Sequence, residues 1–90
     1  MNYQIVEEVE IEKAGLQEED DYIVYNPLLE SVVVVNHTAG ETLLKLKQGQ
    51  TIDEIFGELA LEYKADINEI KNNIQDFLEA MHKKGFIVKM

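Results

Sequence analysis

The residues that could carry out chemistry in this chain are few and far apart in the sequence. A hydrolytic site would need a nucleophile beside a base, and the candidates are Ser31, a few threonines, His37 and His82. His37 lies at the start of one predicted helix and His82 near the end of another, and no spacing brings them together. The chain has no cysteine, which removes thiol nucleophiles, disulfides and cysteine zinc sites. We therefore expect no catalytic site, no metal site and no cofactor.

The acidic run at residues 18–21, EEDD, could attract a hard cation. It lacks the alternating spacing and the central glycine of a calcium loop, so the pattern favours a solvated loop.

The net charge of −10 lies mostly in the first third of the chain. Residues 1–30 carry nine acids and one lysine, and residues 31–90 carry nine acids and seven lysines. This balance disfavours nucleic acid and anionic lipid as partners and favours a basic protein surface. The alternative is that the acids only keep a small protein soluble.

The length of 90 residues predicts one domain over residues 1–90. The first residues have no basic flank and no long apolar run, so we expect no signal peptide. No stretch approaches the roughly 18 apolar residues of a membrane span. We expect a cytoplasmic protein that does not bind membranes.

Three stretches predict strands: residues 7–12 (EEVEIE), 22–25 (YIVY) and 31–35 (SVVVV). The turn signal at Asn26-Pro27 lets the second and third strands pair antiparallel. Four consecutive valines do not alternate with polar residues, so both faces of the third strand need cover. Residues 86–90 predict a short strand or a packed tail.

After Asn36 the apolar residues recur with the spacing of a helix. Three patterns of the capping-box type follow: Thr38–Glu41, Thr51–Glu54 and Asp66–Glu69. They predict helices over residues 38–47, 52–63 and 67–84. The third helix carries one continuous apolar stripe, formed by Ile67, Ile70, Ile74, Phe77, Leu78 and Met81.

Strands followed by three helices resemble a winged helix-turn-helix, a fold that often reads DNA through a basic helix. The third helix is not basic, and the chain has no arginine to pair with guanine. A winged-helix DNA-binding regulator is therefore kept as the alternative function.

Four short motifs occur in a fixed order: Asn36-x-Thr38-x-x-Glu41, Gly49-x-Thr51-x-x-Glu54-Ile55, Phe77-Leu78 and Gly85-Phe86-Ile87. Together they resemble the PqqD-like family, which comprises the small D protein of pyrroloquinoline quinone biosynthesis and related recognition elements for ribosomally made, modified peptides. The resemblance covers roughly residues 22–88. The chain departs from the family at Val35, where leucine is usual, and at Leu43-Leu44, where an aromatic residue is frequent.

This resemblance implies an α+β, winged-helix-like fold with a three-stranded antiparallel sheet packed on a three-helix bundle. It implies a noncatalytic peptide-recognition domain in natural product biosynthesis. The leader segment of a precursor peptide would add as a strand to the edge of strand 31–35, beside the third helix. The peptide would then be delivered to a modifying enzyme, often a radical SAM protein.

The expected peptide-binding residues come from the third strand and the third helix: Ser31, Val32, Val33, Val34, Val35, Lys71, Ile74, Gln75, Leu78 and Met81. An open strand edge presents unpaired main-chain groups, so a homodimer could form there as well. The alternative for this region is that all four valines and the helix stripe are only core. The acidic N-terminal third, including Glu7, Glu8 and Glu10, could dock the enzyme.

Overall fold

The computed structural model describes residues 3–89. The strands are β1 (Tyr3–Ile5), β2 (Glu10–Lys13), β3 (Tyr22–Asn26), β4 (Ser31–Val35) and β5 (Ile87–Lys89). The helices are α1 (His37–Lys47), α2 (Ile52–Glu62) and α3 (Ile67–Lys83). The prediction of an α+β fold with three helices and a three-stranded antiparallel sheet is confirmed. No helix in this part of the chain has the length and hydropathy to cross a membrane.

The three-stranded sheet has the order β2-β3-β4, which leaves β4 at an edge. Val33 pairs with Val24, and Val35 pairs with Tyr22, on the face that packs on the helices. Side chains alternate along a strand, so Val32 and Val34 point to the other face and are exposed. The alternative that all four valines are buried in the core is therefore wrong.

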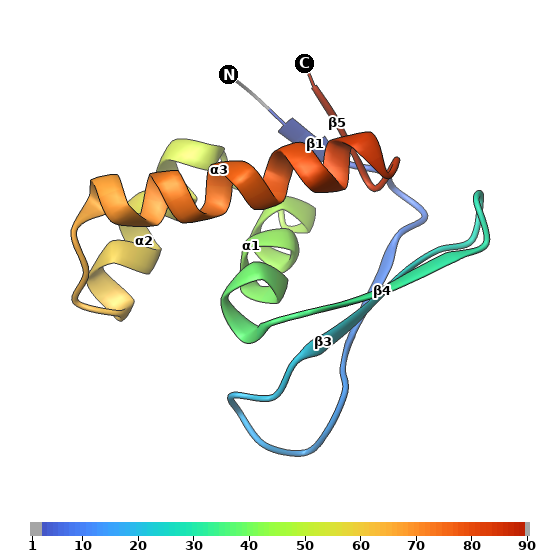
Figure 1. Cartoon of the computed structure of the whole chain (residues 1–90), viewed down its shortest axis with the longest axis horizontal. Helices are drawn as coiled ribbons and strands as arrows, with labels where there is room; N and C mark the ends of the chain where they lie inside the picture. The colour runs from blue at the N-terminus through green and yellow to red at the C-terminus, as the bar shows by residue number, and fades with distance from the viewer. Residues whose placement is uncertain (1–2, 90) are drawn as a thin grey trace.

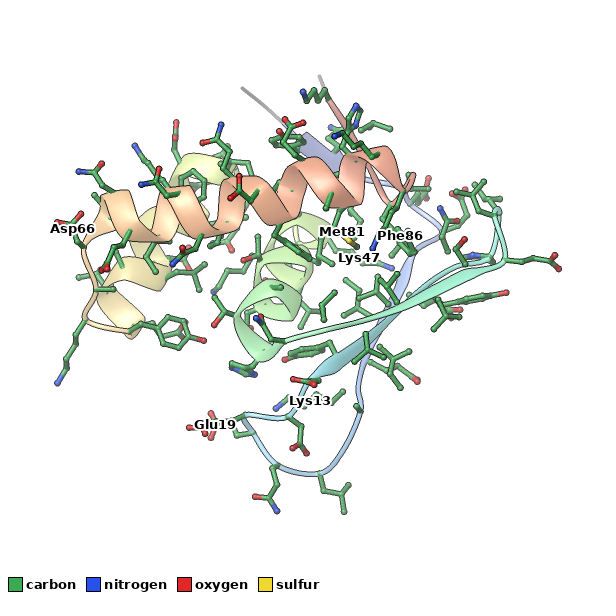
Figure 2. All side chains as sticks on the ribbon, in the orientation of Figure 1. Lys13, Glu19, Lys47, Asp66, Met81 and Phe86 are labelled. Carbon is green, nitrogen blue, oxygen red and sulfur yellow. The ribbon has the colours of Figure 1, made fainter. Side chains whose placement is uncertain are left out.

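The helices cover one face of this sheet (Figure 1). Helix α1 lies between α2 and the sheet, and α2 packs in turn against α3. Figure 2 shows Met81 and Phe86 in the space between α3 and the sheet. Both side chains are at most 2% exposed, and they belong to the same core as Leu43 of α1. From Ile70 to Met81 the apolar stripe of α3 is thus the side of the helix that holds it to the rest of the fold, whereas Ile67 at the start of the predicted stripe is 41% exposed.

A second sheet of two strands, β1 and β5, was not predicted. Ile5 pairs with Ile87, which joins the two ends of the described chain. The hydroxyl of Tyr3 donates to Glu79 Oε1 over 3.0 Å, and Lys89 Nζ lies 3.0 Å from the same oxygen. These contacts fasten the small sheet to α3. The predicted strand over 86–90 is confirmed for Ile87–Lys89, and Met90 lies outside the described residues.

The predicted strand over residues 7–12 begins three residues late. The main-chain N–H of Val9 donates to the carbonyl of Val6 over 3.0 Å, so residues 7 and 8 form a turn and β2 starts at Glu10. The alternation of the pattern still holds, because Val9 is buried and Glu10 is exposed.

Helix α1 begins one residue before its predicted start. Asn36 is the N-cap, and its side-chain oxygen accepts from the N–H of Ala39 over 2.9 Å. The predicted cap at Thr38 is wrong, since Thr38 lies inside the helix. Asparagine is a preferred cap, and Asn36 comes directly after β4, where the extended backbone that a cap needs is already present.

The predicted N-cap residues of the other two helices are confirmed, and the full capping box is present at the start of α2. Thr51 and Glu54 form a reciprocal capping box at the start of α2, with N···O distances of 2.9 and 3.2 Å. Asp66 caps α3 by accepting from the N–H of Asn68 over 2.7 Å. At the other end of α3, Gly85 has φ of +86°, the left-handed conformation that ends a helix.

Candidate functional site

The free edge of β4 offers a row of main-chain groups without partners. An edge strand directs the N–H and C=O of alternate residues away from its neighbour. Within residues 3–89, the main chain of Ser31–Val35 forms hydrogen bonds only with β3. The strand carries no charged side chain. It is therefore a template on which another extended chain can add.

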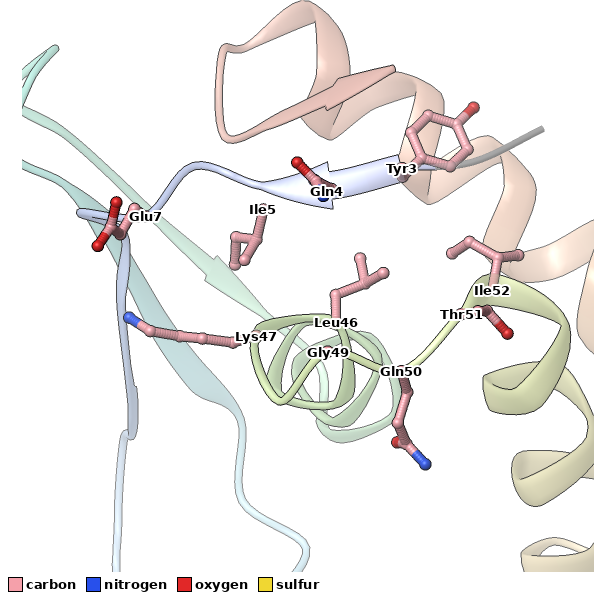
Figure 3. Close-up of a pocket in the computed structure, with 10 residues that line it drawn as sticks. All are labelled: Tyr3, Gln4, Ile5, Glu7, Leu46, Lys47, Gly49, Gln50, Thr51 and Ile52. Atoms are coloured by element: carbon pink, nitrogen blue, oxygen red, sulfur yellow. The ribbon is translucent and has the colours of Figure 1, made fainter. Parts of the chain in front are cut away.

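The opposite edge of the sheet is protected. Strand β2 carries Glu10, Glu12 and Lys13, and charges at an edge discourage pairing with another strand. The Lys47 ammonium donates to the carbonyl of Val9 at the entrance of this strand. Figure 3 shows Lys47 extending from the end of α1 toward the segment that precedes β2. The two edges differ, and only the β4 edge is left free of charge.

A hollow of about 360 Å³ lies where β4 passes into α1. Its lining comes from Asn36, Thr38 and Ala39, from Tyr63, and from Ile70, Asn73, Ile74 and Phe77 of α3. Ile70 and Ile74 are buried, Phe77 is half-buried, and Asn73 is exposed. The hollow thus combines apolar side chains with amide groups. We call the free edge of Ser31–Val35 together with this hollow the β4–α3 groove.

Helix α1 is positioned by a close approach to β3. Gly40 faces the ring of Tyr22, and a Cβ at this position would lie 2.0 Å from Tyr22 Cδ2. The Tyr22 hydroxyl donates to Glu41 Oε1 over 3.0 Å. Burial, with the Glu41 hydrogen bond adding to it, raises the pKa of Tyr22 to about 12. A neutral, bonded tyrosine therefore holds the first turn of α1, and with it one wall of the groove.

The structure divides the residues that were expected to wall the groove from α3. Ile74 lines the β4–α3 groove. Lys71, Gln75 and Leu78 instead line a hollow of about 170 Å³ on the other flank of the helix, where Tyr3 and α2 lie. Met81 is in the core, 2% exposed. The structure does not bring Lys71, Gln75, Leu78 or Met81 to β4. Their role as peptide contacts stays a prediction.

Asn73 and Phe77 line the β4–α3 groove but were not among the predicted groove residues. They are four residues apart, and so they share the flank of α3 on the other side of Ile74 from Lys71 and Gln75. The spacing identifies both flanks of the apolar stripe. It does not say which flank faces β4, because that depends on how the helix is rotated in the fold.

Another hollow, of about 450 Å³, lies between β1 and the connection from α1 to α2. Figure 3 shows Gln4 and Ile5 on one side of it and Leu46, Gln50 and Ile52 on the other. None of its lining residues belongs to β4 or α3. It forms because β1 is present, and β1 was not predicted.

The two histidines lie in separate surroundings. His37 Nε2 is 3.5 Å from Glu41 Oε1, and the His37 ring lies 5.8 Å from the Tyr22 ring. His82 Nδ1 faces the carbonyl of Ile87 at 3.3 Å. Neither histidine contacts Ser31. Over the described range 3–89, no three His, Asp or Glu side chains gather in a way that could hold a metal ion.

Comparisons with known proteins identify the family and support the fold. The sequence matches the family described as "Coenzyme PQQ synthesis protein D (PqqD)" over residues 21–87. No curated protein matches the sequence. The solved structure described as "TbiB1 in Complex with the TbiA(beta) Leader Peptide" superposes with a TM-score of 0.81 at 17% identity, and covers 97% of this chain and 96% of that chain. This likeness shows the fold. The family match covers β3, β4 and all three helices, and it ends at the first residue of β5. The chain belongs to the PqqD family.

Proposed function

We propose that the chain binds the leader segment of a ribosomally made precursor peptide, without catalysis of its own, and presents it to a modifying enzyme. The peptide adds as a strand to the free edge of Ser31–Val35. The observation that carries this proposal is the uncharged, unpaired edge of β4 directly beside the hollow of the β4–α3 groove. Membership of the PqqD family supports it, as does a solved complex of the like-folded TbiB1 with a leader peptide.

Strand addition explains how one small surface could supply both affinity and selectivity. Main-chain bonds to β4 act on any extended peptide, whereas side-chain pockets select among sequences. Side chains of the added strand would alternate between the helix side and the outer side of the sheet. Those on the helix side would point toward Ile74 and Phe77. We expect an apolar leader side chain at this position, with Asn36 and Asn73 available for hydrogen bonds at the rim.

The charge of the protein does not favour the alternative of DNA binding. The exposed side of α3 carries Glu69 and Asp76 as well as Lys83, and Lys84 follows as the C-cap, so this is not a basic surface. The chain as a whole has a charge of −10. A DNA titration at low salt is the simple control for this alternative.

The test is a titration of isotope-labelled protein with the leader of the precursor peptide encoded beside it, followed by amide NMR shifts. We expect saturable changes at Ser31–Val35, Asn73 and Phe77. Changes centred on Lys71 and Gln75 would instead place the peptide on the other flank of α3. The absence of changes at high peptide concentration would contradict the proposal.

A modified peptide separates strand addition from side-chain binding. Methylation of alternate leader amides removes the main-chain donors that face β4 and leaves every side chain in place. We expect weaker binding by about tenfold or more when two such donors are lost, since each hydrogen bond contributes about 1 kcal/mol. Methylation of the amides in the other register is the matched control. Equal affinities for both peptides would exclude pairing with β4.

A second copy of the chain could occupy the same edge, as the sequence analysis expected. Sedimentation velocity with and without the leader peptide distinguishes the two occupants. If β4 edges pair between copies, the peptide will dissociate the dimer as it binds. A dimer that persists at saturating peptide would use another surface.

A further inference from the structure

The face of the three-stranded sheet that points away from the helices has a distinct composition. The register of the strands places its side chains in two cross-strand rows, Glu10–Tyr25–Val32 and Glu12–Ile23–Val34. We call these six residues the outer face. The valines stand along the β4 edge, and the glutamates stand along the β2 edge.

The apolar part of the outer face is exposed. Val34 is 62% exposed, Val32 is 59% exposed and Ile23 is 36% exposed. The solvent side of a sheet that is covered on one face normally carries polar residues. A contiguous group of exposed apolar side chains with a polar border is typical of a surface that binds another protein.

The border of the outer face is acidic and not neutralised. Within residues 3–89, neither Glu10 nor Glu12 takes part in an ion pair. The neighbouring Lys13 belongs to the helix-facing side, where its ammonium lies 6.0 Å from the centre of the Tyr22 ring and donates to the carbonyl of Glu18. Figure 2 shows Lys13 at the base of the loop that carries Glu19. A partner surface that is complementary to the outer face would carry an apolar patch with lysine or arginine beside it.

A peptide strand on β4 would extend the outer face. Half of its side chains would project on the outer side of the sheet, next to Val32 and Val34. A protein that docks there would contact the chain and the peptide together. It would bind the loaded form more tightly than the empty form, since only the loaded form offers both sets of contacts.

We infer that the outer face docks the peptide-modifying enzyme, through an apolar enzyme patch bordered by basic residues, and that the bound leader forms part of this interface. This inference rests on the proposed function, because it takes the peptide to lie on β4. It assigns a surface and a chemistry to the enzyme contact, and it predicts that enzyme affinity depends on peptide occupancy.

The test compares two double variants with the same change in net charge. Glu10→Lys with Glu12→Lys reverses the border of the outer face, and Glu18→Lys with Glu19→Lys reverses two acids in the loop after β2. Binding to the modifying enzyme encoded with the precursor peptide is measured by biolayer interferometry, with and without saturating leader. The salt concentration is roughly 150 mM, where the screening length is about 8 Å.

We expect the first double variant to weaken enzyme binding by about tenfold and the loop variant to weaken it less than about twofold. The single change Ile23→Thr keeps a β-branched residue on the central strand, and we expect it to weaken enzyme binding about fivefold. Wild-type protein should bind the enzyme more tightly with leader than without it. Circular dichroism and the leader affinity of each variant, both expected to match wild type, show that the fold and the groove are intact.

The outcomes separate this inference from the proposed function. If the leader does not bind wild-type protein, the proposed function fails. If the leader binds but both double variants bind the enzyme equally, only the docking inference is overturned. If the leader binds but wild-type protein does not bind the enzyme with or without leader, the presentation of the peptide to the enzyme fails together with the docking inference. A wild-type dimer that Ile23→Thr dissociates in sedimentation would assign the outer face to a second copy of the chain, and would overturn it as well.

Discussion

The side-chain amide of Asn26 donates a hydrogen bond to the main-chain carbonyl of Gly85 over 2.9 Å. Asn26 is the last residue of β3 and is 1% exposed. Its side-chain oxygen accepts from the N–H of Leu28 over 3.0 Å. One amide therefore closes the turn between β3 and β4 and holds that turn against the end of α3. Since β4 and α3 are the walls of the β4–α3 groove, this contact fixes their separation at one end.

Replacement of Asn26 should destabilise the fold. Asn26→Ala removes the partner of the Gly85 carbonyl and of the Leu28 N–H, and because Asn26 itself is 1% exposed we expect a loss of about 1–3 kcal/mol in the free energy of unfolding. Urea denaturation followed by circular dichroism measures it. Asn72→Ala, on an exposed position of α3, is the control and should change stability by less than about 0.5 kcal/mol. Equal effects of the two changes would argue against the bond to Gly85.

Two glycines in helices should respond oppositely to alanine. Gly40→Ala places a methyl group 2.0 Å from Tyr22 Cδ2, and we expect a loss of about 1–3 kcal/mol from this overpacking. Gly57→Ala in α2 meets nothing within 4 Å, and we expect a gain of up to about 1 kcal/mol from helix propensity. Thermal unfolding of both variants tests this. A stabilised Gly40→Ala protein would mean that α1 does not pack on Tyr22 this closely.

The caps of α1 and α2 give a further prediction. Asn36→Ala and Thr51→Ala should each cost about 1 kcal/mol, because each removes the acceptor of a first-turn N–H. Thr38→Ala should cost less, since Thr38 accepts no such bond with its side chain. Chemical denaturation of the three variants checks the order. If Thr38→Ala lowers the free energy of unfolding as much as Asn36→Ala does, Thr38 would be the N-cap, as the sequence pattern predicted.

The sequence predicted best those elements whose signals are local. The four valines predicted β4 with its observed bounds, and the Thr51–Glu54 pattern predicted the start of α2. The cap of α1 was misplaced because two acceptable cap residues, Asn36 and Thr38, lie two positions apart. The preceding strand decides between them, since it leaves Asn36 in an extended conformation.

What the sequence could not predict depends on contacts between distant segments. Strand β1 has three residues, too few for a pattern, and its partner β5 lies at the other end of the chain. The expected groove residues of α3 fell on both flanks of its stripe for a related reason. Helical spacing shows which residues share a flank, but the contact of α3 with α2 and β5 determines which flank faces β4.

The buried hydroxyl of Tyr22 should make stability depend on pH in alkali. Its pKa is raised from 10.0 to about 12, so between these values the folded state keeps a proton that the unfolded state has lost. The contribution of this group to stability is therefore complete below pH 10 and falls by about 2–3 kcal/mol as pH rises toward 12.

Urea unfolding at pH 9 and at pH 11.5 measures the loss. Tyr22→Phe should remove the part of the loss that comes from this group, although it starts from lower stability because Glu41 loses its donor. If Tyr22→Phe keeps the full wild-type dependence, other groups titrate in this range and the raised pKa of Tyr22 is not the source of the loss.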